Sequence, residues 1–224
     1  MKQRVLAGLL LGLVGTGSVI ATAQGAATLN VRLLQAAERG DEAVVRALLK
    51  NGASPNARRA DGRTALTSAA LGNHVRVARV LIDAGANPDW QDDQRNNALL
   101  VSGETGSVAM LREVLRAKPD LTRTNRFGGT ALIPAAHRGH VAYVREILKT
   151  KINVNHVNNL GWTALLEAVI LGDGGARHTE IVRLLLAAGA NPALTDREGV
   201  TPLRHAQHRG YTNIARLLSS SNGR

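Results

Sequence analysis

The chain has 224 residues, with 28 Lys and Arg against 17 Asp and Glu, and a formal net charge of +11 at pH 7. It contains no cysteine, which excludes disulfide bonds and lipid attachment to a cysteine. One Phe, two Tyr and two Trp are too few for an aromatic core, so Ala, Leu and Val must do the packing. This composition favours thin layers of closely packed helices over one thick hydrophobic centre.

The N-terminal segment has the pattern of a secretory signal peptide. Lys2 and Arg4 precede an apolar run at residues 5–20, and Ala21-Thr22-Ala23 has the small-x-small form of a signal-peptidase site. An uncleaved membrane anchor is the alternative, but the run is shorter than the roughly 20 residues that a spanning helix needs. We therefore predict a signal peptide at residues 1–23 with cleavage after Ala23, a short linker at residues 24–28, export across the inner membrane to the periplasm, and no transmembrane segment in the mature chain.

The charge of the mature chain indicates the class of partner. Removal of Lys2 and Arg4 with the signal would leave 26 basic and 17 acidic residues, a net charge of +9. Such a surface favours acidic proteins or an anionic envelope component. No nucleic-acid partner is expected if the chain is exported.

A period of 33 residues organises the rest of the chain. Equivalent positions are 33 residues apart four times and then 38 apart, at Val31, Thr64, Asn97, Thr130, Thr163 and Thr201. Each copy continues with a Leu, a small residue and then a Gly or Asn, which suits two short helices separated by a left-handed turn. A pair of helices this short cannot cover its own apolar faces, so the copies must stack.

The sequence resembles the ankyrin repeat family over residues 29–218. The family's motif appears as Asp61-Gly62-Arg63-Thr64-Ala65-Leu66 and again at residues 196–203, and the closing Gly-Ala-Asn-Pro occurs at residues 85–88 and 189–192. The resemblance implies an all-α solenoid of paired antiparallel helices with β-hairpin turns, and it says little about chemistry. About six units including caps are predicted, at approximately residues 29–57, 58–90, 91–123, 124–156, 157–194 and 195–218, followed by a disordered tail at residues 219–224.

Two segments depart from the repeat. The third unit has Asn97 in place of Thr, Arg95 in place of a turn Gly, and Lys118-Pro119 where Gly-Ala closes the second helix elsewhere, so we predict the lowest local stability there. The fifth unit carries an insertion, Asp173 to Arg177, between its two helices. This insertion is either a tolerated surface loop or a partner-specific hook, since loops both vary and carry function.

Motifs for catalysis are missing from the sequence. There is no Gly-rich phosphate loop, no Gly-x-Ser-x-Gly, no His-Glu-x-x-His and no Cys nucleophile, so we predict no enzyme activity, no catalytic residue and no cofactor. The resemblance assigns His74, His140 and His178 to a structural position after the helix-ending Gly or Asn. The remaining histidines offer at most two-His faces without an adjacent carboxylate or Cys, so no metal site is predicted; these are His137, His156, His205 and His208.

The resemblance places recognition residues just before the Thr and just before the helix-ending Gly of each unit, on the concave side. Units four and five carry large apolar residues at these positions, flanked by arginines, which is the composition of a protein-binding hot spot. Packing between adjacent hairpins is the alternative for Trp162 and Leu160. The predicted partner-binding residues are Arg126, Phe127, His137, Arg138, Leu160, Trp162, Ile170, Leu171 and Arg197.

An arginine column recurs at one position of all six second helices, at Arg46, Arg79, Arg112, Arg145, Arg183 and Arg216. Glu113, Glu146 and Glu180 are expected to neutralise part of it, which would leave an ordinary solvated face. Otherwise the column is a docking strip for an anionic polymer or a membrane surface.

Two functions follow from these surfaces. We predict a non-catalytic, monomeric protein-binding module that acts in the envelope or periplasm as an adaptor, chaperone or inhibitor, through the concave face of units three to five. The alternative is a structural envelope protein that attaches to an anionic polymer or membrane through the arginine column.

Overall fold

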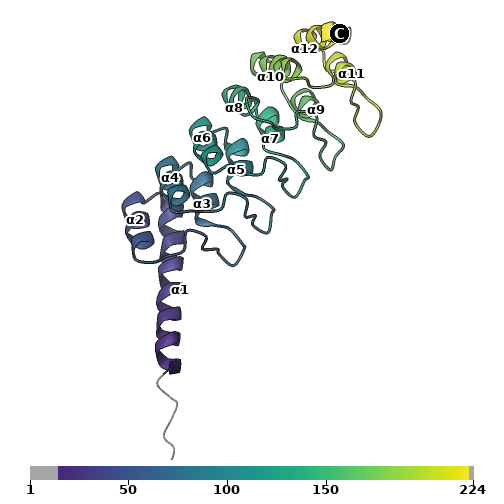
Figure 1. Ribbon diagram of the computed structural model, residues 1–224. Helices are drawn as coiled ribbons and strands as arrows, with labels where there is room; N and C mark the ends of the chain where they lie inside the picture. The colour runs from purple at the N-terminus through teal and green to yellow at the C-terminus, as the bar shows by residue number, and fades with distance from the viewer. Residues whose placement is uncertain (1–14, 222–224) are drawn as a thin grey trace, which may run out of the picture.

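In the computed structural model, which describes residues 15–221 and side chains from residue 25 onward, the chain forms stacked pairs of antiparallel helices (Figure 1). No strand forms over this range, and a single antiparallel bridge joins Arg58 and Thr64. The predicted all-α solenoid is confirmed, although the expected β-hairpin turns are hairpin-shaped loops without strands. The helices are α1 (Gly15–Arg39), α2 (Glu42–Lys50), α3 (Ala65–Leu71), α4 (Val75–Asp83), α5 (Ala98–Thr105), α6 (Val108–Arg116), α7 (Leu132–His137), α8 (Val141–Ile147), α9 (Ala164–Ile170), α10 (Ala176–Ala187), α11 (Pro202–His208) and α12 (Thr212–Ser221).

The helices form two layers along the stack. In one layer, each first helix packs against the first helix of the next unit, in the order α1, α3, α5, α7, α9 and α11. In the other layer, the second helices pack in the same way, in the order α2, α4, α6, α8, α10 and α12. The loops that lead into α3, α5, α7, α9 and α11 project together from one side of the stack (Figure 1). These loops and the first helices form the concave side of the solenoid.

A side-chain cap begins most of the first helices. Thr64 Oγ1 accepts a hydrogen bond from Thr67 N at 3.1 Å, and the same cap recurs at Asn97, Thr163 and Thr201. Among units two to six, unit four is the exception, because the buried Thr130 hydroxyl has no hydrogen-bond partner. Pro134 lacks an N–H and cannot bond back to the Thr130 carbonyl, which leaves α7 with only six residues.

Small residues let the first helices approach one another. Five of the six predicted small positions are fully buried alanines, namely Ala36, Ala69, Ala135, Ala168 and Ala206. The sixth is Ser102, whose hydroxyl lies 2.8 Å from that of the buried Tyr143 in the next unit. Burial raises the pKa of the Tyr143 hydroxyl, so this pair is neutral and joins units three and four.

The ends of the chain differ from the predicted boundaries. Residues 24–28, expected as a linker, belong to α1, since Ala26 and Ala27 favour a helix that continues into Leu29. Residues 219–221, expected in a disordered tail, extend α12, and the hydroxyls of Ser220 and Ser221 donate to the Leu217 carbonyl at 2.9 Å. The predicted cleavage position after Ala23 falls within α1, and residues 1–14 and 222–224 lie outside the described residues.

Within residues 15–221, none of the helices is both long enough and apolar enough to cross a bilayer.

Candidate protein-binding groove

A groove of about 500 Å³ runs along the concave side, from Leu71 at the end of α3 to Leu171 after α9. Its walls come from the loops before α5, α7 and α9, and its floor from the helices themselves. Ile133 and Pro134 of α7 lie at its middle. The groove therefore spans units three to five, where the sequence analysis placed partner binding.

Six of the nine predicted partner-binding residues line this groove, namely Arg126, Phe127, His137, Arg138, Leu160 and Leu171. Phe127 is 53% exposed and Leu160 is 49% exposed, so Leu160 is not hidden between hairpins. Leu71, at 54% exposed, is not among these nine residues and adds to the same apolar surface. The structure thus brings four exposed apolar side chains into one groove.

The other three predicted residues lie outside the groove lining. Ile170 was expected to be exposed but is buried, because all seven residues of α9 are buried and the helix has no side facing solvent. Trp162 is half-buried, and its backbone closes the loop with Asn158 through two 3.0 Å hydrogen bonds. Arg197 is exposed, covers Gly161 and donates to the Asn159 carbonyl, so it supports the loop of unit five from the C-terminal side.

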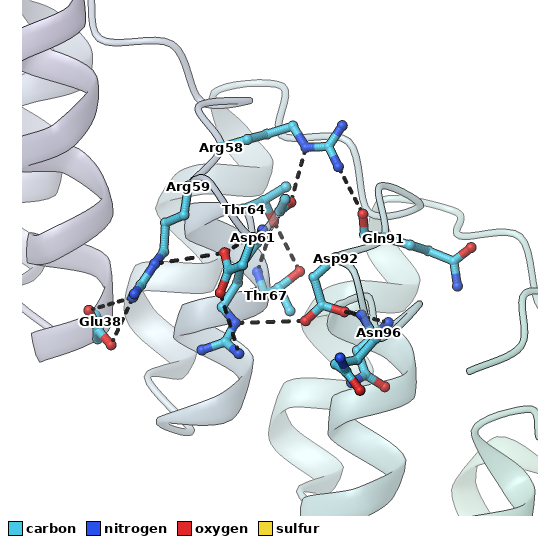
Figure 2. A network of polar contacts seen from close by, with 12 residues as sticks. Glu38, Arg58, Arg59, Asp61, Thr64, Thr67, Gln91, Asp92 and Asn96 are labelled. Carbon is cyan, nitrogen blue, oxygen red and sulfur yellow. Dashed lines mark hydrogen bonds and ion pairs between the residues drawn. The ribbon is translucent and has the colours of Figure 1, made fainter. Parts of the chain in front are cut away.

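The loops that form the groove walls are tied to one another. Figure 2 shows the first of these contacts, where the Arg58 guanidinium donates to the Gly62 carbonyl at 3.0 Å and to the Gln91 carbonyl of the next loop at 2.9 Å. Backbone bonds repeat this connection down the stack, from Asp93 to Asp61 at 3.0 Å, Arg126 to Gln94 at 3.2 Å and Asn159 to Phe127 at 2.9 Å. The groove walls are therefore held in register by neighbouring repeats.

Two arginines flank the apolar residues and are already paired. The Arg126 guanidinium lies 4.7 Å from the centre of the Phe127 ring and donates to the Gln94 side chain. Arg138 forms an ion pair with Glu104 on α5. Each arginine thus links two adjacent repeats while it borders the groove.

A buried carboxylate, Glu167 of α9, lies in the groove and was missed by the sequence analysis. Asn158 Nδ2 donates to Glu167 Oε1 at 3.0 Å, and His137 Nδ1 lies 3.7 Å from Oε2. Burial raises the pKa of Glu167 to about 7, although the hydrogen bond from Asn158 opposes the shift. We call Glu167, Asn158 and His137 the Glu167 recess. The available signal was one acidic residue inside the otherwise apolar stretch Ala164–Ile170.

The three histidines assigned to structural positions do connect repeats. His74 Nε2 lies 3.1 Å from the Glu38 carbonyl, His140 Nε2 lies 3.1 Å from that of Glu104, and His178 Nε2 lies 2.9 Å from that of His137. The structural prediction for these residues is confirmed. Across the described residues, the His, Asp and Glu side chains form no group of three that could hold a metal ion.

The arginine column is largely an ion-pair ladder. Three of its members bond to a glutamate of the following repeat, in the pairs Arg79–Glu113, Arg112–Glu146 and Arg145–Glu180, with N–O distances of 2.5, 2.9 and 2.8 Å. Arg46 pairs with Glu42 and Arg183 with Glu180 inside their own helices. Five of the six arginines of the column are therefore paired with a glutamate, which leaves little unpaired positive charge on this face.

The insertion in unit five forms a compact turn. Asp173 Oδ1 accepts the Gly175 N–H at 2.9 Å and lies 2.7 Å from His178 Nδ1, while Gly174 adopts φ +69° against the Tyr211 ring. Ala176 and Arg177 begin α10, which makes it longer than α8. The insertion is thus tied to the stack on both sides.

Known proteins with the same architecture match this chain. A family model described as ankyrin repeats (3 copies) matches residues 33–125 and 106–196, and one described as ankyrin repeats (many copies) matches residues 175–218. The crystal structure of an ankyrin repeat domain from Acinetobacter baumannii AYE is 47% identical, with a TM-score of 0.82, over 85% of this chain and 97% of that chain.

Two further relatives support the same assignment. EF0377, an ankyrin repeat protein of known structure, is 34% identical with a TM-score of 0.81, over 84% of this chain and 96% of its own. The ankyrin repeat protein YahD of Escherichia coli K12 is 54% identical over 52 residues, and the match spans 23% of this chain and 26% of YahD. The chain therefore belongs to the ankyrin repeat family, whose members generally mediate protein–protein interactions and are typically non-catalytic.

Proposed function

We propose that this protein is an exported, non-catalytic binding module that holds a segment of a partner protein in the concave groove of units three to five. The observation that carries the proposal is the gathering of four exposed apolar side chains in one groove, namely Leu71, Phe127, Leu160 and Leu171. Exposed apolar groups of this size, rimmed by Arg126 and Arg138, are typical of a protein interface.

The groove favours a chain segment over a flat protein surface. Its floor is helical and its walls are loops that neighbouring repeats hold in place, so an extended or helical segment can enter with little rearrangement of this protein. The net charge of +9 that would remain after cleavage of the signal favours a partner whose overall surface is acidic. An adaptor, a chaperone or an inhibitor in the envelope would each use such a site.

The proposed export rests on the sequence of the N-terminus. Lys2, Arg4, the apolar run and Ala21-Thr22-Ala23 together have the form of a cleaved signal. Cell fractionation with N-terminal sequencing tests this directly, and we expect a periplasmic protein that begins at Gln24. A cytoplasmic protein that retains Met1 would contradict export and leave the groove proposal standing.

The groove is tested by the double variant Phe127→Ala/Leu160→Ala in a crosslinking pull-down from the envelope fraction. We expect a specific captured protein to be lost, while the matched control Val157→Ala retains it. Val157 is 48% exposed, like the two groove residues, but does not line the groove. Capture that is unchanged in a folded double variant would overturn the proposal.

No specific observation supports the alternative function, in which the protein attaches to an anionic polymer or membrane through the arginine column. Its arginines at positions 46, 79, 112, 145 and 183 already pair with glutamates, which leaves less free charge for an anionic polymer. Release by moderate salt from envelope fractions would be the signature of that alternative. We expect retention through the groove to resist the same salt.

A further inference from the structure

The Glu167 recess presents a carboxylate that lacks a full counter-ion. Glu167 is 6% exposed, yet it borders the groove. Asn158 satisfies Oε1, whereas no hydrogen bond from a described residue reaches Oε2. The one basic group within 4.0 Å of the carboxylate in residues 25–221 is His137, at 3.7 Å, which is too long for a hydrogen bond.

The charged groups around the recess do not supply the missing charge. Arg138 is engaged by Glu104, and Asp173 lies against His178 behind His137. Burial and the nearby Arg138 lower the pKa of His137, so its imidazole is neutral at neutral pH. A buried carboxylate without a cation is unfavourable when ionised, and a positively charged ligand group would correct this.

The acidic position occurs once among the repeats. The residues equivalent to Glu167, four after the position that Thr163 holds in unit five, are Gln35, Ser68, Val101, Pro134 and His205. Among the described repeats, this position of the first helix therefore carries a carboxylate only in unit five. The apolar residues Phe127, Leu160 and Leu171 border the same groove, so one ligand segment can contact them and the carboxylate together.

We infer that the Glu167 recess receives a basic side chain, Arg or Lys, from the partner segment, while apolar side chains of that segment contact Phe127, Leu160 and Leu171. This inference rests on the proposed function of the groove. A guanidinium or ammonium group donates charge-assisted hydrogen bonds to Oε2, and in a site shielded from water such bonds are stronger than in solvent.

The Glu167 recess would determine which partner segments bind, whereas the net charge of the whole protein determines which partners are attracted from a distance. The protein is basic as a whole, so its long-range field draws acidic partners and not basic ones. A basic side chain is then selected by the local carboxylate within a segment that is otherwise apolar or acidic. A segment that lacks the basic residue would leave Glu167 unpaired and would be rejected.

A phage-displayed library of random dodecapeptides tests the inference with the purified protein at pH 7.5. We expect selected peptides to carry Arg or Lys next to apolar residues. Their Kd should rise at least tenfold on Glu167→Gln and also rise on Phe127→Ala/Leu160→Ala. The control is Glu198→Gln, which removes an exposed carboxylate outside the groove and should leave the Kd within threefold, and circular dichroism verifies that each variant is folded.

The possible failures separate the two proposals. Peptides that depend on Phe127 and Leu160 but show no basic residue, or are indifferent to Glu167→Gln, overturn the basic-side-chain inference and leave the groove function intact. A selection without binders, or with binders indifferent to the Phe127→Ala/Leu160→Ala variant, overturns the groove function itself.

The pH dependence of the wild-type protein gives a second readout that needs no variant to fold. Affinity for a selected basic peptide should rise between pH 6 and pH 8 as Glu167 ionises, and this rise should be absent in Glu167→Gln. The groups that face the recess are His137, Arg138, Glu104, His178 and Asp173, and the loss of a positive charge from His137 would give the opposite trend. An affinity that falls over this range would overturn the inference.

Discussion

Arg79 of α4 and Glu113 of α6 form an ion pair across two repeats, with Arg79 Nη2 2.5 Å from Glu113 Oε1. Glu113 is buried, and Arg116 of its own helix approaches the other carboxylate oxygen at 2.7 Å. The hydrogen bond from Arg79 holds the pKa of Glu113 below its usual value, and burial opposes this only in part. The pair therefore connects the second helices of units two and three.

Stability should fall in acid because of this ladder. A carboxylate whose pKa is lowered by folding stabilises the protein above its ordinary pKa and loses that effect as the pH falls through the lowered value. Glu113 and Glu146 both belong to this class. We expect Glu113→Gln to be less stable than wild type at pH 7 and to lose less stability between pH 4.5 and pH 2, measured by urea unfolding. The control Glu198→Gln, at an exposed residue, should follow wild type throughout.

Glu167 should produce the opposite dependence. Its pKa in the folded protein is raised to about 7, so its neutral form stabilises the fold below pH 4.5 and this effect is lost as the pH rises through 7. A rise of this pKa from 4.5 to about 7 corresponds to about 3 kcal/mol. We expect Glu167→Gln to match wild type at pH 4 and to be more stable by up to that amount at pH 8.5, in urea unfolding. Equal stability of the two proteins at pH 8.5 would show that Glu167 is not destabilised by ionisation.

The third unit contains two residues that strain the backbone. Arg95 has φ 58° and Lys118 has φ 53°, the left-handed region that favours Gly. Arg95→Gly and Lys118→Gly should each raise the free energy of unfolding by about 0.5–1 kcal/mol, after the entropy of the new Gly is subtracted. Asn73→Gly, at φ 53°, is the matched control and should change little because Asn tolerates this region. If Arg95→Gly and Lys118→Gly both lower the free energy of unfolding, the backbone at these two residues is not strained.

Gly103 of α5 lies at a close contact between units three and four. A Cβ at this position would lie 2.2 Å from the Ala131 carbonyl oxygen, which is backbone and cannot move aside easily. We expect Gly103→Ala to destabilise the protein by about 3 kcal/mol, at the upper end of overpacking effects. Gly129→Ala is the control, since its Cβ would meet ordinary contacts at 3.5 Å and beyond. Thermal unfolding of the two variants makes the comparison.

The period of 33 residues was sufficient to predict the fold and the side of the solenoid that holds the groove. Positions such as Thr64 and His140 act through contacts that every repeat makes, so their roles follow from their place in the period. The extension of α1 before residue 29 and the extension of α12 to Ser221 do not follow from it, because the terminal units lack a neighbour on one side.

The residues that define the groove were harder to predict. Ile170 was assigned to the surface because its position is exposed in an average repeat, whereas the packing of α9 buries it here. Glu167 was missed because its depth depends on three elements at once: α9 itself, the loop that carries Asn158, and His137 at the end of α7. A pattern within one repeat does not contain that information.

The ion-pair ladder affects how easily the solenoid can gain a repeat by duplication. Arg112 pairs with Glu146 of the following unit, and its neighbour Glu113 pairs with Arg79 of the preceding unit. Unit three therefore carries both the arginine and the glutamate that this ion pair between units requires. Unit four repeats the arrangement, since Glu146 pairs backward and Arg145 pairs forward with Glu180. A tandem duplication of either unit would create a new boundary whose charges already match. The solenoid can therefore gain a repeat in a single genetic event without a compensating substitution in the ladder.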